Sequence, residues 1–169
     1  MRKLISAAAV LMLLLAGCSG GKAQTVLTPE ERTQLYETAI TSARDQETNE
    51  ALPLVTSADD DLAELIFTLL GVSSEDMTAY ALSVSPMNVR AYAIAAILPA
   101  AGKDDAVRDG LHGFIDNQKQ SFEQYLADQY DIAVNARLET LEDGTLLLCM
   151  CEQQDAVFDA IRDTIEAAK

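Results

Sequence analysis

An alternation of apolar and small residues, followed by an apolar run, constrains the fold of this chain more than any other feature. In residues 80–85, Tyr80, Leu82 and Val84 occupy every second position, which is the period of a β-strand. A turn at residues 86–88 leads into residues 91–98, which are apolar on both faces. This pattern predicts a β-hairpin whose second strand is central in a sheet.

A second hairpin is predicted closer to the C-terminal end. Val134, Ala136 and Leu138 alternate with polar residues, and the Asp143-Gly144 pair that follows is a strong signal for a tight turn. Residues 146–151 then form an apolar run of strand length.

Helical patterns surround the two hairpins. Thr28-Pro29-Glu30-Glu31 is typical of a helix start, with Thr at the N-cap, Pro at the first position and Glu at the third. Helices are expected at residues 28–47, 57–70 and 103–127 and from Asp155 onward. The order predicts an α+β domain: an antiparallel sheet of about four strands built from two hairpins, packed by helices mainly on one face, with N-terminal helices.

The N-terminal residues resemble a bacterial lipoprotein leader. Arg2 and Lys3 precede a twelve-residue apolar segment, which is shorter than the roughly 20 residues that cross a bilayer. The segment ends in Leu-Ala-Gly-Cys at residues 15–18, which resembles a lipobox. The resemblance implies cleavage between Gly17 and Cys18 and a diacylglycerol thioether on Cys18, which would anchor the chain durably to the membrane.

The expected organisation is therefore a signal peptide at residues 1–17, a lipidated Cys and tether at 18–27, and a single domain at 28–169. Nine extended tether residues reach about 30 Å at most. Without the leader, ten basic residues would face 27 acidic ones. So acidic a chain is not expected to bind nucleic acid, because that affinity comes largely from Lys and Arg on phosphates.

No residue pattern predicts catalytic chemistry, a metal site or a cofactor. The single histidine, His112, lies beside the apolar stripe of the 103–127 helix, where a boundary histidine with a local hydrogen bond is expected. The three aspartates at residues 59–61 are interpreted as stabilising the N-terminal end of a helix and not as a metal site. Cys149 and Cys151 share one face of a strand and are expected to be buried free thiols. Nothing singles out two of the 27 acidic residues as a hydrolase pair.

The 118–130 segment, QKQSFEQYLADQY, followed by strand, Gly144 and strand, resembles the bacterial lipoprotein family called domain of unknown function 4358. The resemblance extends from Leu62 to Ile165 and includes residues 80–97, with Gln118, Phe122, Tyr125 and Gly144 at the recurrent positions of the family. Gln118 and Tyr125 are expected to form buried hydrogen bonds. The resemblance implies lipoprotein export and an α+β domain, and it implies no activity.

The leading expectation is a lipid-anchored extracytoplasmic lipoprotein that serves as a non-catalytic binding or accessory module, with an envelope protein as a possible partner. One alternative is an extracytoplasmic carboxylate-based hydrolase, which a pocket with two carboxylates of raised pKa would favour. The other is a capture protein for a small ligand or cation, which a deep pocket lined by Tyr80, Tyr92 or Tyr125 would favour.

Overall fold

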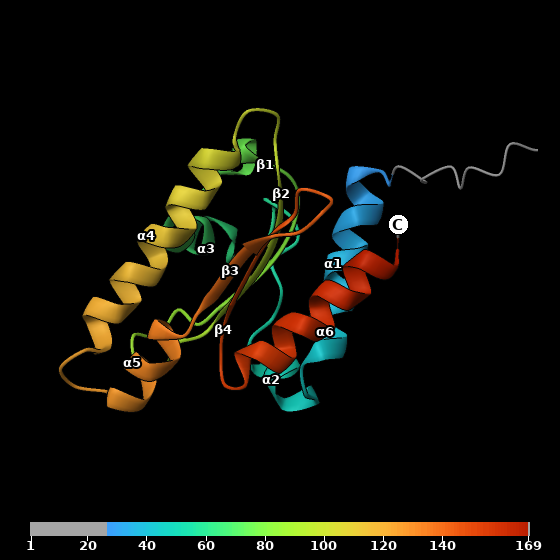
Figure 1. Ribbon diagram of the computed structural model, residues 1–169. Coiled ribbons are helices and arrows are strands. Elements are labelled where there is room, and N and C mark those ends of the chain that lie inside the picture. Colours follow the sequence, from blue (N-terminus) through green and yellow to red (C-terminus); the bar gives the residue numbers. More distant parts are fainter. Residues whose placement is uncertain (1–26, 169) are drawn as a thin grey trace, which may run out of the picture.

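A four-stranded antiparallel sheet lies at the centre of the computed structural model, which describes residues 27–168 (Figure 1). The strands lie in the order β1-β2-β4-β3. Their bounds are β1 (Met77–Val84), β2 (Ala93–Pro99), β3 (Arg137–Thr140) and β4 (Leu146–Met150). β1 with β2 and β3 with β4 form the two predicted hairpins, and antiparallel pairing of β2 with β4 joins them into one sheet. The predicted α+β class and sheet are confirmed.

Six α-helices and one 3-10 helix accompany the sheet within the described residues. They are α1 (Pro29–Ala43), α2 (Gln46–Ala51), α3 (Ala63–Leu70), the 3-10 helix η1 (Ser74–Asp76), α4 (Asp104–Phe122), α5 (Ala127–Val134) and α6 (Gln154–Ala167).

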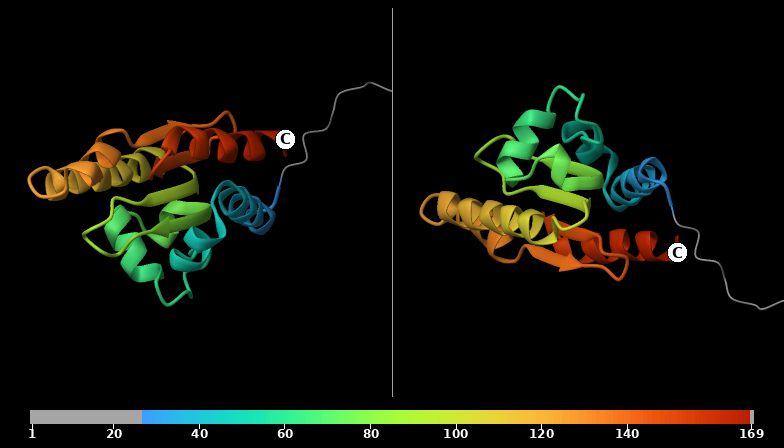
Figure 2. Two further views of the ribbon diagram at one scale, coloured as in Figure 1. Left: turned by 90° about the horizontal axis from the view of Figure 1, so that it is seen from below. Right: turned by 90° about the horizontal axis from the view of Figure 1, so that it is seen from above.

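The helices cover both faces of the sheet, so the expectation of helices mainly on one face is wrong. α3, α4 and α5 pack on one face, and α1 and α6 pack on the other (Figures 1 and 2). The reason lies partly in β1, where Ala79, Ala81 and Ser83 are small and fully covered. Such residues suggest an exposed face by hydropathy, but their size lets α1 approach the strand closely.

The first predicted helix is interrupted where the candidate site forms. α1 begins at the expected capping box: the Thr28 hydroxyl accepts the backbone N–H of Glu31, and the Glu31 carboxylate accepts that of Thr28. The helix ends at Ala43, and Asp45 then caps the separate helix α2 through the N–H of Thr48. The chain therefore turns sharply at Arg44 and Asp45 instead of continuing to residue 47.

The long helix of the sequence analysis is also divided. α4 ends at Phe122, and α5 occupies residues where the sequence suggests a helix end and the start of a strand. β3 accordingly begins at Arg137. In α5, the side-chain oxygen of Gln129 accepts a hydrogen bond from the backbone N–H of Ala91 at 2.8 Å. This bond connects the helix to the residues just before β2.

The two ends of α1 lie at opposite ends of the molecule (Figure 1). Its first turn lies beside the C-terminal end of α6, and its last turn leads to α2. Fifteen helical residues span roughly 22 Å.

None of the helices in the described part of the chain has the length and apolar character needed to cross a membrane.

Candidate ligand-binding groove

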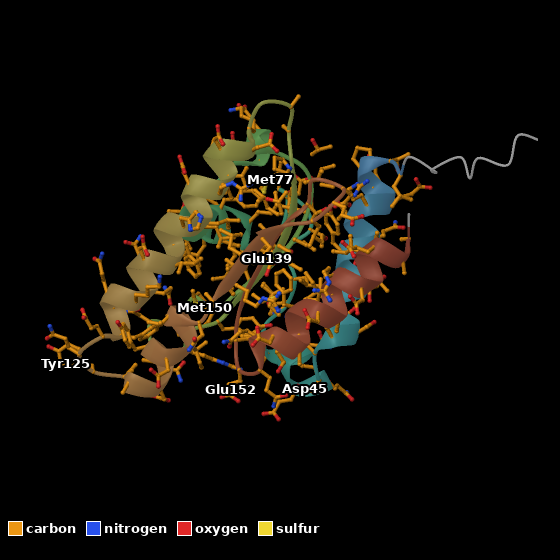
Figure 3. All side chains as sticks on the ribbon, in the orientation of Figure 1. Asp45, Met77, Tyr125, Glu139, Met150 and Glu152 are labelled. Atoms are coloured by element: carbon orange, nitrogen blue, oxygen red, sulfur yellow. The ribbon has the colours of Figure 1, made fainter. Side chains whose placement is uncertain are left out.

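A groove of about 780 Å³ opens at the end of the molecule where α1 gives way to α2. The α1–α2 loop, the β1–β2 turn, α5 and the β4–α6 loop contribute its walls. Asp45 and Glu152 mark two of these segments in Figure 3. We call it the arginine groove, and its polar lining includes Arg44, Asp45, Arg90, Tyr92, Glu152 and Gln153.

Arg44 is fixed in the groove wall by hydrogen bonds from two of its three guanidinium nitrogens. Nε donates to the Asn49 side-chain oxygen at 2.9 Å. Nη1 shares its two hydrogens among three acceptors: the Leu52 carbonyl at 3.1 Å, the Ser83 hydroxyl at 2.8 Å and the Tyr92 hydroxyl at 3.0 Å. These partners come from α2, the segment after it, β1 and the residue preceding β2, so the side chain is held by parts of the fold that are distant in sequence.

The positive charge of Arg44 is not neutralised by these contacts. An amide, a carbonyl and two hydroxyl groups accept its hydrogen bonds, and all of them are neutral. Burial raises the pKa of Tyr92 above 10.0, although its bond to Arg44 acts in the opposite direction, so the phenol is protonated at neutral pH.

The remaining nitrogen of this guanidinium, Nη2, forms no hydrogen bond with any described residue. No buried side-chain nitrogen or oxygen in residues 27–168 lacks a partner, so Nη2 is accessible to solvent. Arg44 therefore offers a charged, oriented donor that is unused within the described chain.

Arg90 brings a second guanidinium to the same tyrosine. Its central carbon lies 5.4 Å from the centre of the Tyr92 ring, within the range of a cation–π contact. Tyr92 thus contacts Arg44 through its hydroxyl and Arg90 through its ring face. Two cations are placed along one largely buried side chain.

Unpaired arginines are unusual in so acidic a chain. Eight Lys and Arg residues lie within the described part of the chain, and five of them form ion pairs with carboxylates: Arg32, Lys103, Lys119, Arg137 and Arg162. The three that form none are Arg44, Arg90 and Arg108, and the first two line the groove. An unpaired guanidinium in a cleft is suited to a carboxylate or another anion from outside.

Carboxylates also line the arginine groove, and none of them forms an ion pair with its guanidinium groups. Hydrogen bonds from Thr48 lower the pKa of Asp45, and the charges of Arg44 and Arg90 lower it further. The arginines are therefore near Asp45, yet none of its oxygens lies within 4.0 Å of their nitrogens. Glu47 and Glu152 line the groove as well, and neither forms a hydrogen bond or ion pair with a described residue.

Two residues that follow β4 also line the groove. The Cys151 thiol is buried, and burial raises its pKa to about 11. Gln153 has φ 55° and ψ 34°, and it is the only non-glycine residue of the described chain with a positive φ. This conformation costs roughly 1–2 kcal/mol, a cost that proteins often tolerate at functional sites.

Of the three tyrosines considered in the sequence analysis, only Tyr92 lines this groove. Tyr80 lies on the other face of the sheet, where its ring meets Phe67 edge-on at 5.6 Å. Tyr125 is 85% exposed at the turn after α4 and points away from the body of the molecule (Figure 3). The expected buried hydrogen bond of Tyr125 is therefore wrong, and Gln118 is partly buried without a hydrogen bond to a described residue.

The other residues singled out from sequence do not gather at a site. Gly17 and Cys18 lie outside the described residues. His112 is exposed on α4 and forms no local hydrogen bond, contrary to expectation. Cys149 and Cys151 are buried free thiols, as predicted. Within residues 27–168, no three His, Cys, Asp or Glu side chains are grouped so that they could hold a metal ion.

Residues 54–151, more than half of the chain, match one protein-family model. The chain belongs to the family described as Domain of unknown function (DUF4358). No curated protein and no solved structure matches it. The DUF4358 match includes the whole sheet and, within the groove, Arg90, Tyr92 and Cys151, whereas Arg44 and Asp45 precede it. The match begins eight residues before the predicted limit, at residue 54 against Leu62, and it ends inside the predicted range, at residue 151 against Ile165.

Sequence reasoning did not identify Arg44 or Arg90 as site residues. The composition contains one usable signal: the chain has only 12 basic residues against 27 acidic ones, so each arginine stands out. One arginine directly follows a helix and the other lies in a hairpin turn, but only the folded chain shows that they meet at Tyr92.

Proposed function

We propose that this DUF4358 protein is a lipoprotein anchored on the extracytoplasmic side of a bacterial membrane, and that its domain is a non-catalytic binding module. The observation that carries the binding role is the arginine groove, in which Arg44 and Arg90 lack carboxylate partners and share Tyr92. Its volume of about 780 Å³ falls in the range of small-molecule sites, roughly 300–1,000 Å³.

The position of the groove suits a chain held by its N-terminal segment. The groove lies at the C-terminal end of α1, roughly 22 Å from the end at which the described chain begins. Anchoring through Cys18 and a tether of about 30 Å would leave that end of the domain open to the extracytoplasmic space.

A carboxylate-based hydrolase is less well supported. A carboxyl group that acts as a general acid needs a raised pKa. The described carboxyl groups with a shifted pKa are Asp45, Asp76, Asp128 and Asp143, and hydrogen bonds lower all four. Capture of a small ligand is the favoured form of binding, because Tyr92 lines a groove of the expected kind.

The anchor is tested with Cys18→Ser, because the sulfur of Cys18 is the atom that would carry the lipid. We expect the variant to remain unprocessed or to leave the membrane fraction, whereas Cys151→Ser keeps wild-type processing and fractionation. Cys18→Ser protein of mature size that stays in the membrane fraction would contradict the lipoprotein assignment.

The binding role is tested in two experiments: an activity screen on the purified full chain, and photo-crosslinking of the chain in cells. The screen covers esters, peptides and glycosides, and we expect no turnover. A photoreactive residue at exposed Met87 on the groove rim should yield an adduct, and one at exposed Tyr125 should not. Turnover that disappears on changing one Asp or Glu would replace the binding module with an enzyme.

A further inference from the structure

We infer that the arginine groove takes a small zwitterion, a molecule that carries a free carboxylate and a free amine on an apolar frame, such as an amino acid or a short peptide. The inference depends on the proposed binding role of the groove and adds the chemical class of its ligand. It rests on guanidinium and carboxylate groups that line one cleft without forming ion pairs with one another.

The carboxylate would bind to the two guanidinium groups. Arg44 Nη2 is solvent-accessible and unpartnered, while hydrogen bonds from Nε and Nη1 fix the plane of the group. Arg90 forms no ion pair with a described residue and lies over the Tyr92 ring. A guanidinium held in this way loses little conformational entropy when it binds a carboxylate.

The amine would bind to carboxylates of the groove. Glu47 and Glu152 have no hydrogen-bonding or ionic partner among the described residues, and Asp45 keeps one oxygen beyond the bond to Thr48. A ligand with negative charge alone would meet three carboxylates, and one with positive charge alone would meet two guanidinium groups. Only a molecule with both charges complements both kinds of group.

The frame of the ligand would contact apolar side chains between and beside the charges. Met87 and Val89 in the β1–β2 turn are 61% and 62% exposed, which is high for large apolar residues. Ile132 of α5 and Val157 of α6 also line the groove. A ligand of amino-acid or dipeptide size with an aliphatic side chain matches this lining.

Calorimetry on the full chain in mild detergent tests the inference with L-leucine and L-leucyl-L-leucine as probes. Each probe is compared with its N-acetyl form, which lacks the amine charge, and its amide, which lacks the carboxylate. We expect at least one unmodified probe to bind about tenfold or more tightly than both modified forms, in line with the strength of charged hydrogen bonds. Equal binding of the three forms, or no binding by any of them, would overturn the inference.

Matched variants locate the two charges. Arg90→Gln should weaken the unmodified and N-acetyl probes about tenfold, whereas Arg108→Gln, which changes an arginine bonded to Thr140 outside the groove, should weaken neither. Glu47→Gln combined with Glu152→Gln should weaken the unmodified probe and should not weaken its N-acetyl form, so that the two affinities converge. Variants that alter all probes equally would contradict separate sites for the two charges.

The crosslinking experiment distinguishes failure of this inference from failure of the proposed function. If Met87 forms an adduct in cells but no zwitterion binds in calorimetry, the binding role stands and this ligand class is rejected.

Discussion

Gly110 lies where the backbone of α4 closely approaches the C-terminal end of α3. A Cβ atom there would lie against the carbonyl oxygens of Gly71 and Leu70, the latter at 2.8 Å, and backbone atoms cannot rotate away. We expect Gly110→Ala to lower the free energy of unfolding by about 1–3 kcal/mol in urea titrations. Gly113→Ala, on the same helix with open space around it, should raise that free energy by about 0.5–1 kcal/mol. Equal effects of the two changes would mean that the helices do not meet at Gly110.

Asp143 is a second residue with a measurable consequence, because it links the β3–β4 turn to α1. Its carboxylate pairs with Arg32 and accepts the backbone N–H of Thr145 at 3.0 Å, and the Thr145 hydroxyl lies 2.6 Å from the hydroxyl of buried Tyr36. Burial acts to raise the pKa of Asp143, but hydrogen bonds from Thr145 and Arg32 outweigh it and lower that pKa below 3.8.

The sign of this shift sets the pH dependence of Asp143. A carboxyl group with a lowered folded-state pKa stabilises the fold above its unfolded-state pKa, and this contribution is lost as the pH falls through the folded-state value. At pH 7 we expect Asp143→Asn to cost about 1–3 kcal/mol in urea unfolding. The difference from wild type should shrink as the pH falls below 3.8. A constant difference from pH 7 to the acid limit would contradict an ionised, stabilising Asp143.

At the scale of elements, α4 covers one face of the sheet through a stripe of apolar residues. Val107, Leu111, Phe114, Ile115 and Phe122 are buried along it. Phe122→Ala should lower the free energy of unfolding by about 3–5 kcal/mol, because it removes a fully buried ring. Tyr125→Ala, three residues later and 85% exposed, should change it by less than about 0.5 kcal/mol. A loss below about 1 kcal/mol for Phe122→Ala would show that the stripe does not pack on the sheet in solution.

At the scale of the whole molecule, the two layers of helices enclose β4 and its thiols. Cys149 is fully buried on the face covered by α6, and burial raises its pKa well above 9.0. In the Cys18→Ser chain, we expect both remaining thiols to react slowly with an aromatic disulfide reagent under native conditions. Both should react rapidly in denaturing urea, because the thiolate is the reactive form and unfolding exposes it. Rapid native labelling, or a Cys149–Cys151 disulfide found by mass spectrometry, would contradict this packing.

Local patterns in the sequence determined the elements and the class of fold. The period of Tyr80, Leu82 and Val84, the Asp143-Gly144 turn and the capping box at Thr28 depend on neighbouring residues, and each appears in the structure as predicted. Gly71 ends α3 in the left-handed conformation for the same local reason. The lipobox at Cys18 is also a local pattern, and the anchor that it predicts awaits the fractionation experiment.

Only the tertiary structure decided which faces are covered and where a site forms. Ala81 and Ser83 suggest a solvent face by composition, yet α1 and the segment that follows it cover them. Arg44 and Tyr92 are separated by 48 positions in the chain, and they meet because the Leu52–Val55 segment and β1 bring the end of α1 to the start of β2. Contacts of this range depend on the packing of several elements at once, which no local pattern of residues specifies.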